Sequence, residues 1–211
     1  MSKRLLAWDA TGDFGSLAFM EDDRLVEEVA LESSDGFAHV LFGEIESLLA
    51  RHHLKLQEMD AFATASGPGS FTGVRVGLTA AKGFAEAGGR RVVAVSNLQA
   101  IAWFGKKELR AVVIDARRGE IYGAVYDSQL QLVQQEVVTT LADWKARLPE
   151  GDVELISNGL AVDGATLAPK AIARAIGSIA MKRLQEGAMQ DPADVDANYV
   201  RRSDAELKWR E

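Results

Sequence analysis

Short hydrophobic runs separated by polar turns open the chain and predict three β-strands, over residues 4–8, 16–20 and 25–31. The last two runs flank an acidic tip over residues 21–23, which predicts an antiparallel meander. The rest of the first half predicts a helix over 35–53, a strand over 61–65, a helix over 70–87 and a strand over 91–95. The predicted order of the first half is therefore β-β-β-α-β-α-β.

A second copy of this pattern begins after a helical stretch near residues 98–104. It predicts strands over 111–114, 121–126 and 130–138, a helix near 141–148, a strand over 153–156 and a helix from about 166 to 184.

A shift of 106 positions without a gap places residues 6–10 over 112–116 and residues 18–21 over 124–127. Two hairpins of similar composition could match in this way by chance. A duplication would instead give two lobes, each a mixed sheet flanked by helices, with a cleft between them. We expect this duplicated α/β fold, with an N-terminal lobe over 1–104 and a C-terminal lobe over 105–211.

Each half places a carboxylate at the end of its first strand and a turn directly after it. The candidate loop residues are Asp9, Thr11 and Gly12 in the first half and Asp115, Arg118 and Gly119 in the second. A carboxylate in this position can hold a cation, and turn N–H groups can cradle phosphate oxygens. Arg117 and Arg118 suit an anion by charge, but their bulk does not suit a tight cradle. The loops therefore form either a working nucleotide site or inherited loops that now serve structure or partner contacts.

The densest motif is the glycine-rich run over residues 67–77. Ser70 or Thr72 can cap the helix that follows and leave N–H groups at its positive end, so the run predicts either an anion site or a tight, closely packed turn. Gly73, Gly77 and Ala80 give this helix a surface almost without side chains. Because each interior glycine costs about 0.5–1 kcal/mol relative to alanine, a sheet or another helix is expected to pack closely there.

The helix predicted over 35–53 has a hydrophobic arc of roughly 200°, whereas burial on one side needs only about 100°. Either this helix lies between two layers of its own protein, or one margin of the arc joins the small-residue helix in a protein–protein interface. The candidate interface residues are Phe37, Leu41, Phe42, Ile45 and Leu49 in the first helix and Gly73, Arg75, Val76, Gly77 and Ala80 in the second. On this hypothesis, Gly77→Leu or Phe42→Asp abolishes pairing and leaves the fold largely intact.

Composition narrows the chemistry. The 211 residues are 47% hydrophobic and 26% charged, with no cysteine and with three histidines, His39, His52 and His53. Thiolate metal sites and cysteine nucleophiles are excluded, and we expect neither a catalytic nor a metal-ligating set. The net charge of −7 argues against autonomous binding of nucleic acid. No run is long enough to cross a membrane, and we expect a cytoplasmic protein.

Four segments together carry a family resemblance. They are residues 7–11, 66–77, 114–122 and 199–206, with Gly67-Pro68-Gly69-Ser70-Phe71-Thr72-Gly73-Val74-Arg75 as the most specific run. In this order, and over essentially the whole chain, they resemble the bacterial TsaB (YeaZ) family. The resemblance implies a two-lobed ribonuclease H-like/actin-like fold, shared with actin, hexokinase and sugar kinases.

The resemblance also implies a function. It predicts a non-catalytic dimerisation and activating subunit that pairs with TsaD, and with the ATPase TsaE, in a complex that transfers threonylcarbamoyl from threonylcarbamoyl-adenylate to N6 of the anticodon-adjacent adenosine of tRNA. It implies no cofactor of the chain's own, ATP only at the level of the complex, contact with tRNA only through the complex, and no membrane. A homodimer through the same helices is expected when TsaD is absent.

TsaD-like proteins are expected to bind a metal through a His-x-x-x-His pair, and the matching stretch here, over residues 95–102, has no histidine. The alternative function is an actin-like or sugar-kinase-like ATP-binding enzyme with a degenerate phosphate site. A peptidase would need a nucleophile or metal motif that the sequence does not offer.

Overall fold

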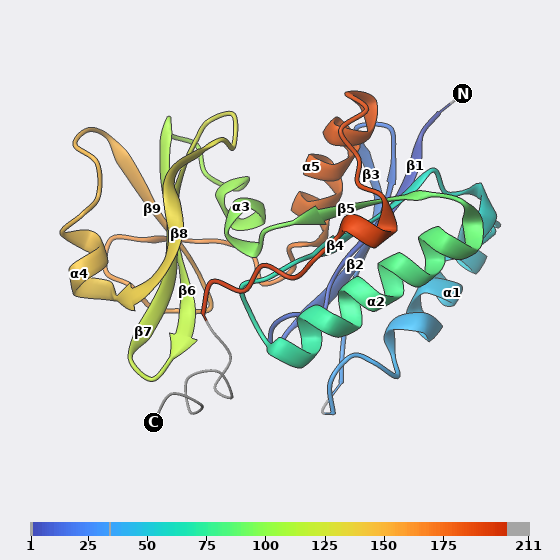
Figure 1. Cartoon of the computed structure of the whole chain (residues 1–211), viewed down its shortest axis with the longest axis horizontal. Coiled ribbons are helices and arrows are strands. Elements are labelled where there is room, and N and C mark those ends of the chain that lie inside the picture. The colour runs from blue at the N-terminus through green and yellow to red at the C-terminus, as the bar shows by residue number, and fades with distance from the viewer. Residues whose placement is uncertain (1, 34, 202–211) are drawn as a thin grey trace. The chain divides into compact units, whose positions relative to one another are not determined.

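A five-stranded sheet lies at the centre of each of two units (Figure 1). The computed structural model describes residues 2–33 and 35–201. The first unit contains the chain up to Asn97 together with Lys170–Ala197. The second contains Leu98–Pro169 and the described residues from Asn198 to Arg201.

The first sheet has the strand order β3-β2-β1-β4-β5. Its strands are β1 (Arg4–Asp9), β2 (Gly15–Glu21), β3 (Arg24–Leu31), β4 (Ala61–Ala65) and β5 (Arg91–Val95). The central β1 is antiparallel to β2 and parallel to β4. Strands β1, β2 and β4 are buried almost throughout, which explains why their sequences are continuous hydrophobic runs rather than alternating ones.

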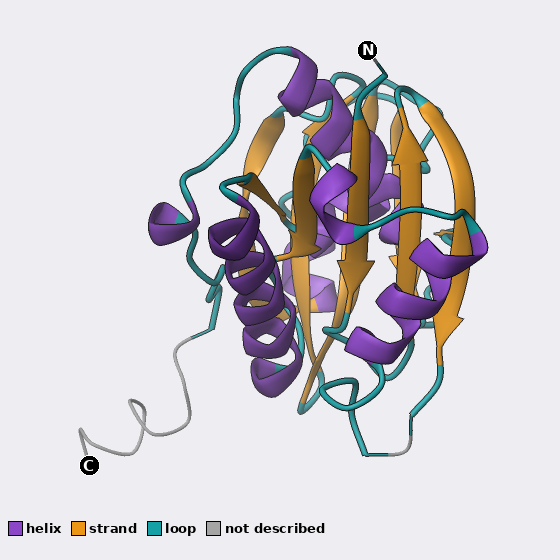
Figure 2. Ribbon diagram, turned by 90° about the vertical axis from the view of Figure 1, so that its right-hand side faces the viewer, coloured by secondary structure: helices purple, strands orange, loops and turns teal. Residues whose placement is uncertain are grey.

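Helices cover both faces of the first sheet (Figures 1 and 2). They are α1 (Leu41–Arg51), α2 (Phe71–Gly88) and α5 (Ala173–Gln185), with the 3₁₀ turns η1 (Leu56–Glu58) and η2 (Pro192–Asp194). Leu6 and Trp8 of β1 pack in one core with α1 and α2. Ala7 points the other way, toward Gly177 of α5. The alternation of side chains along β1 therefore gives each face its own helical layer.

The second sheet has the order β10-β9-β6-β7-β8. Given from the other edge, as β8-β7-β6-β9-β10, this order matches that of the first sheet strand by strand. Its strands are β6 (Leu109–Arg117), β7 (Glu120–Asp127), β8 (Leu132–Thr140), β9 (Val153–Asn158) and β10 (Thr166–Leu167), with the short helices α3 (Asn97–Ala102) and α4 (Leu141–Lys145). β6 is antiparallel to β7 and parallel to β9, as β1 is to β2 and β4. The predicted duplication is confirmed at the level of strand order.

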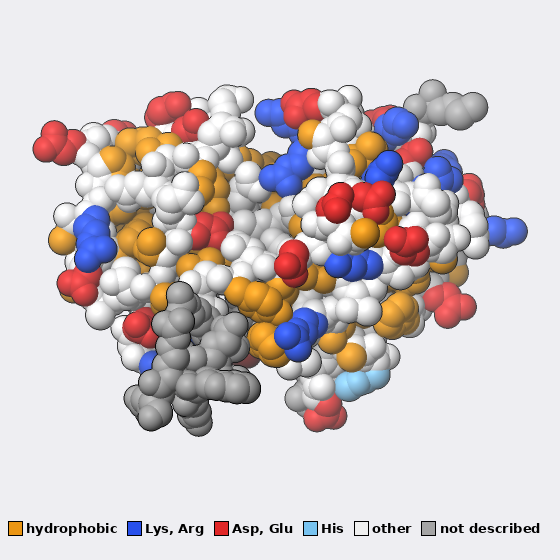
Figure 3. Space-filling model, in the orientation of Figure 1, with side chains coloured by type: hydrophobic (Ala, Val, Ile, Leu, Met, Phe, Trp, Pro, Cys, Tyr) orange, Lys and Arg blue, Asp and Glu red, His pale blue; other side chains and the backbone are white. Residues whose placement is uncertain are grey.

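Charged side chains are spread over the visible face of both units (Figure 3). Within the described part of the chain, no helix has both the length and the hydrophobicity needed to span a membrane.

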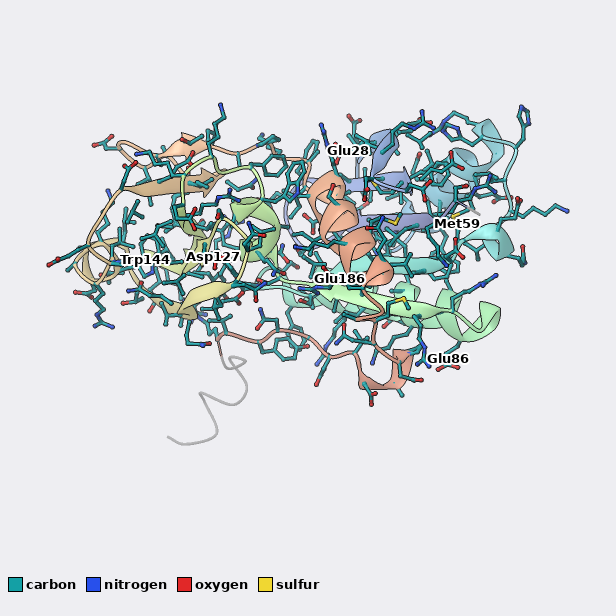
Figure 4. The ribbon with its side chains drawn as sticks, turned by 90° about the horizontal axis from the view of Figure 1, so that it is seen from above. Glu28, Met59, Glu86, Asp127, Trp144 and Glu186 are labelled. Atoms are coloured by element: carbon teal, nitrogen blue, oxygen red, sulfur yellow. The ribbon has the colours of Figure 1, made fainter. Side chains whose placement is uncertain are left out.

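The predicted division of the chain at residue 104 differs from the observed one, because the helix α5 belongs to the first unit. The Ser16 hydroxyl accepts the N–H groups of Ile172 and Ala173 at 3.2 and 3.0 Å. Glu28 accepts the N–H of Arg174 at 2.8 Å. Figure 4 shows α5 with Glu28 at one end and Glu186 at the other. Both acceptors satisfy N–H groups at the start of α5, and this fixes the helix to the first sheet.

Two predicted helices also have different limits. The helix predicted over 35–53 begins at Leu41, and the segment predicted as a helix over 166–184 starts with the strand β10 before α5 begins at Ala173. In the first case Phe37 and Val40, which the predicted arc of roughly 200° included, precede the helix, so that arc is too wide. In the second, pairing with β9 decides the conformation of a two-residue strand that has no periodicity of its own.

Candidate functional site

The first candidate loop satisfies its own polar groups. Asp9 is 4% exposed, and its Oδ1 accepts both the backbone N–H of Thr11, at 2.8 Å, and the Thr11 hydroxyl, at 2.6 Å. Burial raises the pKa of Asp9, and the two hydrogen bonds from Thr11 oppose that rise. The Asp9 carboxylate therefore stabilises the loop that follows its own strand.

Thr11 and Asn97 connect this loop to the ends of two other strands. The Asn97 side-chain amide donates to the Thr11 hydroxyl, and both residues are buried. The Asn97 Oδ1 accepts the N–H of Gly67 at 3.0 Å, and the Gly67 carbonyl accepts the N–H of Asn97 at 2.9 Å. The stretch over 95–102 that lacks histidine thus contributes a structural asparagine.

The start of α2 packs directly on the first loop. The N–H of Ser70 donates to the carbonyl of Thr11 at 2.6 Å, and Ser70 caps the helix by accepting the N–H of Gly73 at 3.3 Å. A Cβ on Gly69 would lie 2.6 Å from the Thr11 carbonyl oxygen, and one on Gly73 would lie 2.0 Å from that of Ala10. The glycine-rich motif is therefore the tightly packed turn of the two alternatives, with Ser70 as its cap.

The second candidate loop is a tight hairpin. The side chain of Asp115 is 43% exposed, and its Oδ1 accepts the N–H of Arg117 at 2.7 Å, as Asp9 accepts that of Thr11. β6 and β7 are joined by Arg118 and Gly119 alone, with φ values of +58° and +78°. This is the geometry of a two-residue type I′ turn, which is too short to wrap around a phosphate.

Arg201, the last residue that the structure describes, contacts this hairpin. The Arg201 guanidinium donates to the carbonyl of Ala116 at 2.9 Å, pairs with Glu120, and lies over the ring of Tyr122 at 5.8 Å. The segment over 114–122 thus meets the described part of the segment over 199–206 at Arg201, just as the segments over 7–11 and 66–77 meet at Thr11; residues 202–206 lie outside the described part. Sequence reasoning missed both links, because nothing in the spacing of the residues joins segments so far apart.

We use the term α1–α2 surface for the exposed side of these two helices: Phe42 and Gly43 on α1, and Thr72, Arg75, Thr79 and Gly83 on α2. Phe42 is 51% exposed, and its ring meets that of Phe84 at 5.4 Å. A Cβ on Gly43 or Gly83 would meet no atom within 4 Å, so these glycines leave open space. Figure 3 shows hydrophobic and basic side chains side by side near the start of α2.

The ten candidate interface residues divide by burial. Phe37, Leu41, Ile45, Leu49, Gly77 and Ala80 are buried, Gly73 and Val76 are half-buried, and Phe42 and Arg75 are exposed. The buried residues of α1 pack in the core that this helix shares with β1 and α2. Gly77 faces β4, since a Cβ there would lie 2.7 Å from the Thr64 hydroxyl. The absence of a side chain at Gly77 thus allows α2 to pack closely on β4 of the same unit.

Glu27, Arg51 and His52 form a cluster of titratable side chains on the surface of the first unit. Glu27 accepts from Arg51 at 2.8 Å and contacts the His52 ring nitrogen at 2.7 Å, and the Arg51 hydrogen bond holds the pKa of Glu27 below its usual value. Among the described residues, no group of three or more acidic or histidine side chains is placed to hold a metal ion.

Two sheets of one strand order, each with an aspartate at or near the end of its central strand, define the duplicated ribonuclease H-like/actin-like class. The sequence model of the family described as TsaD, tRNA N6-adenosine threonylcarbamoyltransferase, matches residues 31–159, which is more than half of the chain. The structure is similar to that of YeaZ from Pseudomonas aeruginosa, with a TM-score of 0.78 and 24% identity over 93% of this chain and 99% of that one.

Two relatives narrow the class. The tRNA threonylcarbamoyladenosine biosynthesis protein TsaB of Bacillus subtilis is 29% identical over 227 aligned positions, which cover 98% of both chains. The protein of the same name from Escherichia coli is 32% identical over 127 positions, covering 58% of this chain and 54% of that one. The chain belongs to the TsaB (YeaZ) family.

Proposed function

We propose that this chain is a non-catalytic subunit that pairs with TsaD through the α1–α2 surface, and acts with TsaE in the transfer of threonylcarbamoyl to N6 of the anticodon-adjacent adenosine of tRNA. Membership of the TsaB family supports a role in the biosynthesis of tRNA threonylcarbamoyladenosine. ATP and tRNA are handled by the assembled complex, and the chain has no cofactor of its own.

The exposed ring of Phe42 is the observation that carries this proposal. Contact of water with a phenylalanine ring that is 51% exposed is unfavourable, and burial of the ring against a partner would remove that cost. Gly43 and Gly83 leave open space for an approaching backbone or side chain. Aromatic side chains are enriched at the centres of protein interfaces, and the two glycine positions leave room for a partner beside Phe42.

The two loops support an accessory role rather than independent nucleotide chemistry. Asp9 directs an oxygen to Thr11, whose backbone N–H and hydroxyl are both used inside the protein. The second loop is a hairpin turn with two arginines. The alternative, an ATP-binding enzyme with a degenerate phosphate site, requires the first loop to release these hydrogen bonds, and a titration of the isolated chain with Mg·ATP distinguishes the two functions.

Reconstitution tests the proposal directly. Purified chain is mixed with TsaD and TsaE of the same organism, tRNA, ATP and threonylcarbamoyl-adenylate, and modified adenosine is counted with and without the chain. We expect strict dependence on the chain and no product from the chain alone. Unchanged output in its absence would contradict the proposal, and product from the chain alone would contradict its non-catalytic status.

A homodimer through the α1–α2 surface is proposed for the chain without TsaD. Sedimentation of the chain alone, and then with increasing TsaD, tests it. We expect a homodimer that is replaced by the heterodimer, since both use the same surface. Coexistence of both contacts in one larger particle would show that the two surfaces differ.

A further inference from the structure

Buried polar side chains join three loops at one edge of the first sheet. The loops follow β1, β4 and β5, whose parallel strands end at the same edge. Their hydrogen bonds run in one direction: the N–H of Gly67 donates to Asn97 Oδ1, the Asn97 side-chain amide donates to Thr11 Oγ, and the Thr11 hydroxyl donates to Asp9 Oδ1. Asp9, Thr11 and Asn97 are all at most 5% exposed.

Each group in this series has a fixed role. The Thr11 hydroxyl has one proton, which it donates to Asp9, so it acts as an acceptor toward Asn97. Asn97 must therefore turn its NH₂ group to Thr11 and its carbonyl oxygen to Gly67. Removing the Thr11 hydroxyl takes the acceptor from the buried Asn97 NH₂ group and one of two donors from Asp9, which costs more than the loss of a single bond.

The same loop contacts the N-cap of α2, the helix that carries part of the α1–α2 surface. The backbone carbonyl of Thr11 accepts the N–H of Ser70 at 2.6 Å, and Ser70 is the N-cap of α2. The exposed side chains of Thr72 and Arg75 follow within the next turn and a half of the helix. The position of Thr11 thus determines where the exposed face of α2 begins.

We propose that Thr11 and Asn97 are positioning residues for partner binding: their hydrogen bonds fix the start of α2 and hold its exposed face in the orientation that TsaD recognises. The inference rests on the proposed function, since it concerns the helix through which the partner docks. The loop after β1 thus binds the N-cap of α2 through the carbonyl of Thr11.

Thr11→Val tests the inference because it keeps the shape of the side chain and removes the hydroxyl. We expect its Kd for TsaD to rise about tenfold or more, mainly through faster dissociation. Thr11→Ser restores the hydroxyl and is expected to bind within about twofold of the unchanged chain. Amide hydrogen exchange is expected to accelerate over residues 67–76 in Thr11→Val and to stay unchanged in the rest of the first unit.

Met20→Ala is the matched control. Met20 is 1% exposed and lies against Gly177, on the face of the same sheet that α5 covers. This variant lowers the melting temperature without touching the start of α2, and we expect its affinity for TsaD to remain that of the unchanged chain. Should Thr11→Val fail to fold, Asn97→Ala removes the hydrogen bond to Thr11 from the other side, together with the acceptor of the Gly67 N–H, and adds no bulk.

The outcomes separate the two proposals. If the unchanged chain does not bind TsaD, the proposed function fails. If it binds, but Thr11→Val binds as tightly as Met20→Ala does, or its exchange rises evenly across the unit, the positioning role is overturned. Weak binding by Thr11→Val, with rescue by Thr11→Ser and local exchange, establishes it.

Discussion

At the scale of single residues, two glycines of α2 test how closely the helix approaches the rest of its unit. A Cβ on Gly73 would lie 2.0 Å from the carbonyl oxygen of Ala10, whereas one on Gly83 would meet nothing within 4 Å. We expect Gly73→Ala to lower the free energy of unfolding by about 3 kcal/mol, because backbone must move. Gly83→Ala is expected to raise it by about 0.5–1 kcal/mol, because alanine stabilises a helix interior. Urea unfolding of both variants measures this, and equal effects would show that α2 does not rest on the loop.

Asp9 gives a residue-scale prediction for pH. Burial raises its pKa in the folded state above the ordinary value of 3.8, so the folded chain holds this proton more tightly than the unfolded chain does. Linkage then requires that the Asp9 contribution to stability is largest at low pH and is lost as the pH rises from about 4 through the folded pKa.

Asp9→Asn isolates this contribution, since it keeps an acceptor for Thr11 and removes the charge. We expect the difference in free energy of unfolding between Asp9→Asn and the unchanged chain to shift in favour of the variant as the pH rises toward neutrality. Denaturant unfolding over a pH series measures it. A difference that is constant with pH would mean that Asp9 titrates in the folded protein as it does in water.

At the scale of elements, Phe42 shows what α1 contributes beyond its buried face. Phe42→Asp places a charge on the α1–α2 surface and is expected to weaken TsaD binding at least tenfold, about 1.4 kcal/mol, with a small change in the melting temperature. Val133→Asp in β8 is the control, because Val133 is 47% exposed on the second unit. Titration calorimetry with TsaD compares them, and equal losses would refute a contact specific to α1.

Gly77→Leu changes a buried position inside the unit, whereas Phe42→Asp changes an exposed one. Gly77 is buried, its carbonyl accepts the indole N–H of Trp8 at 3.1 Å, and its missing side chain makes room for Thr64. The prediction that leucine at this position leaves the fold intact is therefore wrong, because leucine would push α2 away from β4. A loss of pairing in that variant would not report on an interface.

The elements show how far the sequence could be interpreted. The strands over 61–65 and 91–95 and the duplication marked by Asp9 and Asp115 followed from local hydrophobic pattern, and the structure has them. For the glycine-rich motif the sequence left an anion site and a tight turn open, with Ser70 or Thr72 as the cap, and the structure has a tight turn capped by Ser70. Burial was not predictable in this way, because periodicity identifies a hydrophobic face but not what covers it. Leu41 and Phe42 are adjacent and both hydrophobic, yet Leu41 is buried and Phe42 is half-exposed to water.

At the scale of the whole molecule, the division into units crosses the order of the sequence. α5 follows the second unit in the chain but packs on the first sheet, where its Gly177 meets Met20. The second unit has a separate core, in which Trp144 is 3% exposed and packs with Val113 and Ile121. Two cores without shared residues are expected to loosen independently.

Hydrogen exchange of two core variants tests this independence. Met20→Ala, which removes about 2–5 kcal/mol of packing, is expected to accelerate exchange in residues 4–95 and in α5. Trp144→Ala, which removes about 3–5 kcal/mol of packing, is expected to accelerate exchange in residues 109–158. We expect α5 to stay protected, although α5 is closer in the sequence to Trp144 than to the strands of the first sheet. Loss of protection in α5 on Trp144→Ala would mean that the helix depends on the second core. Retained protection would show that residues 98–169 are inserted into a unit that is stabilised by segments on both sides of them.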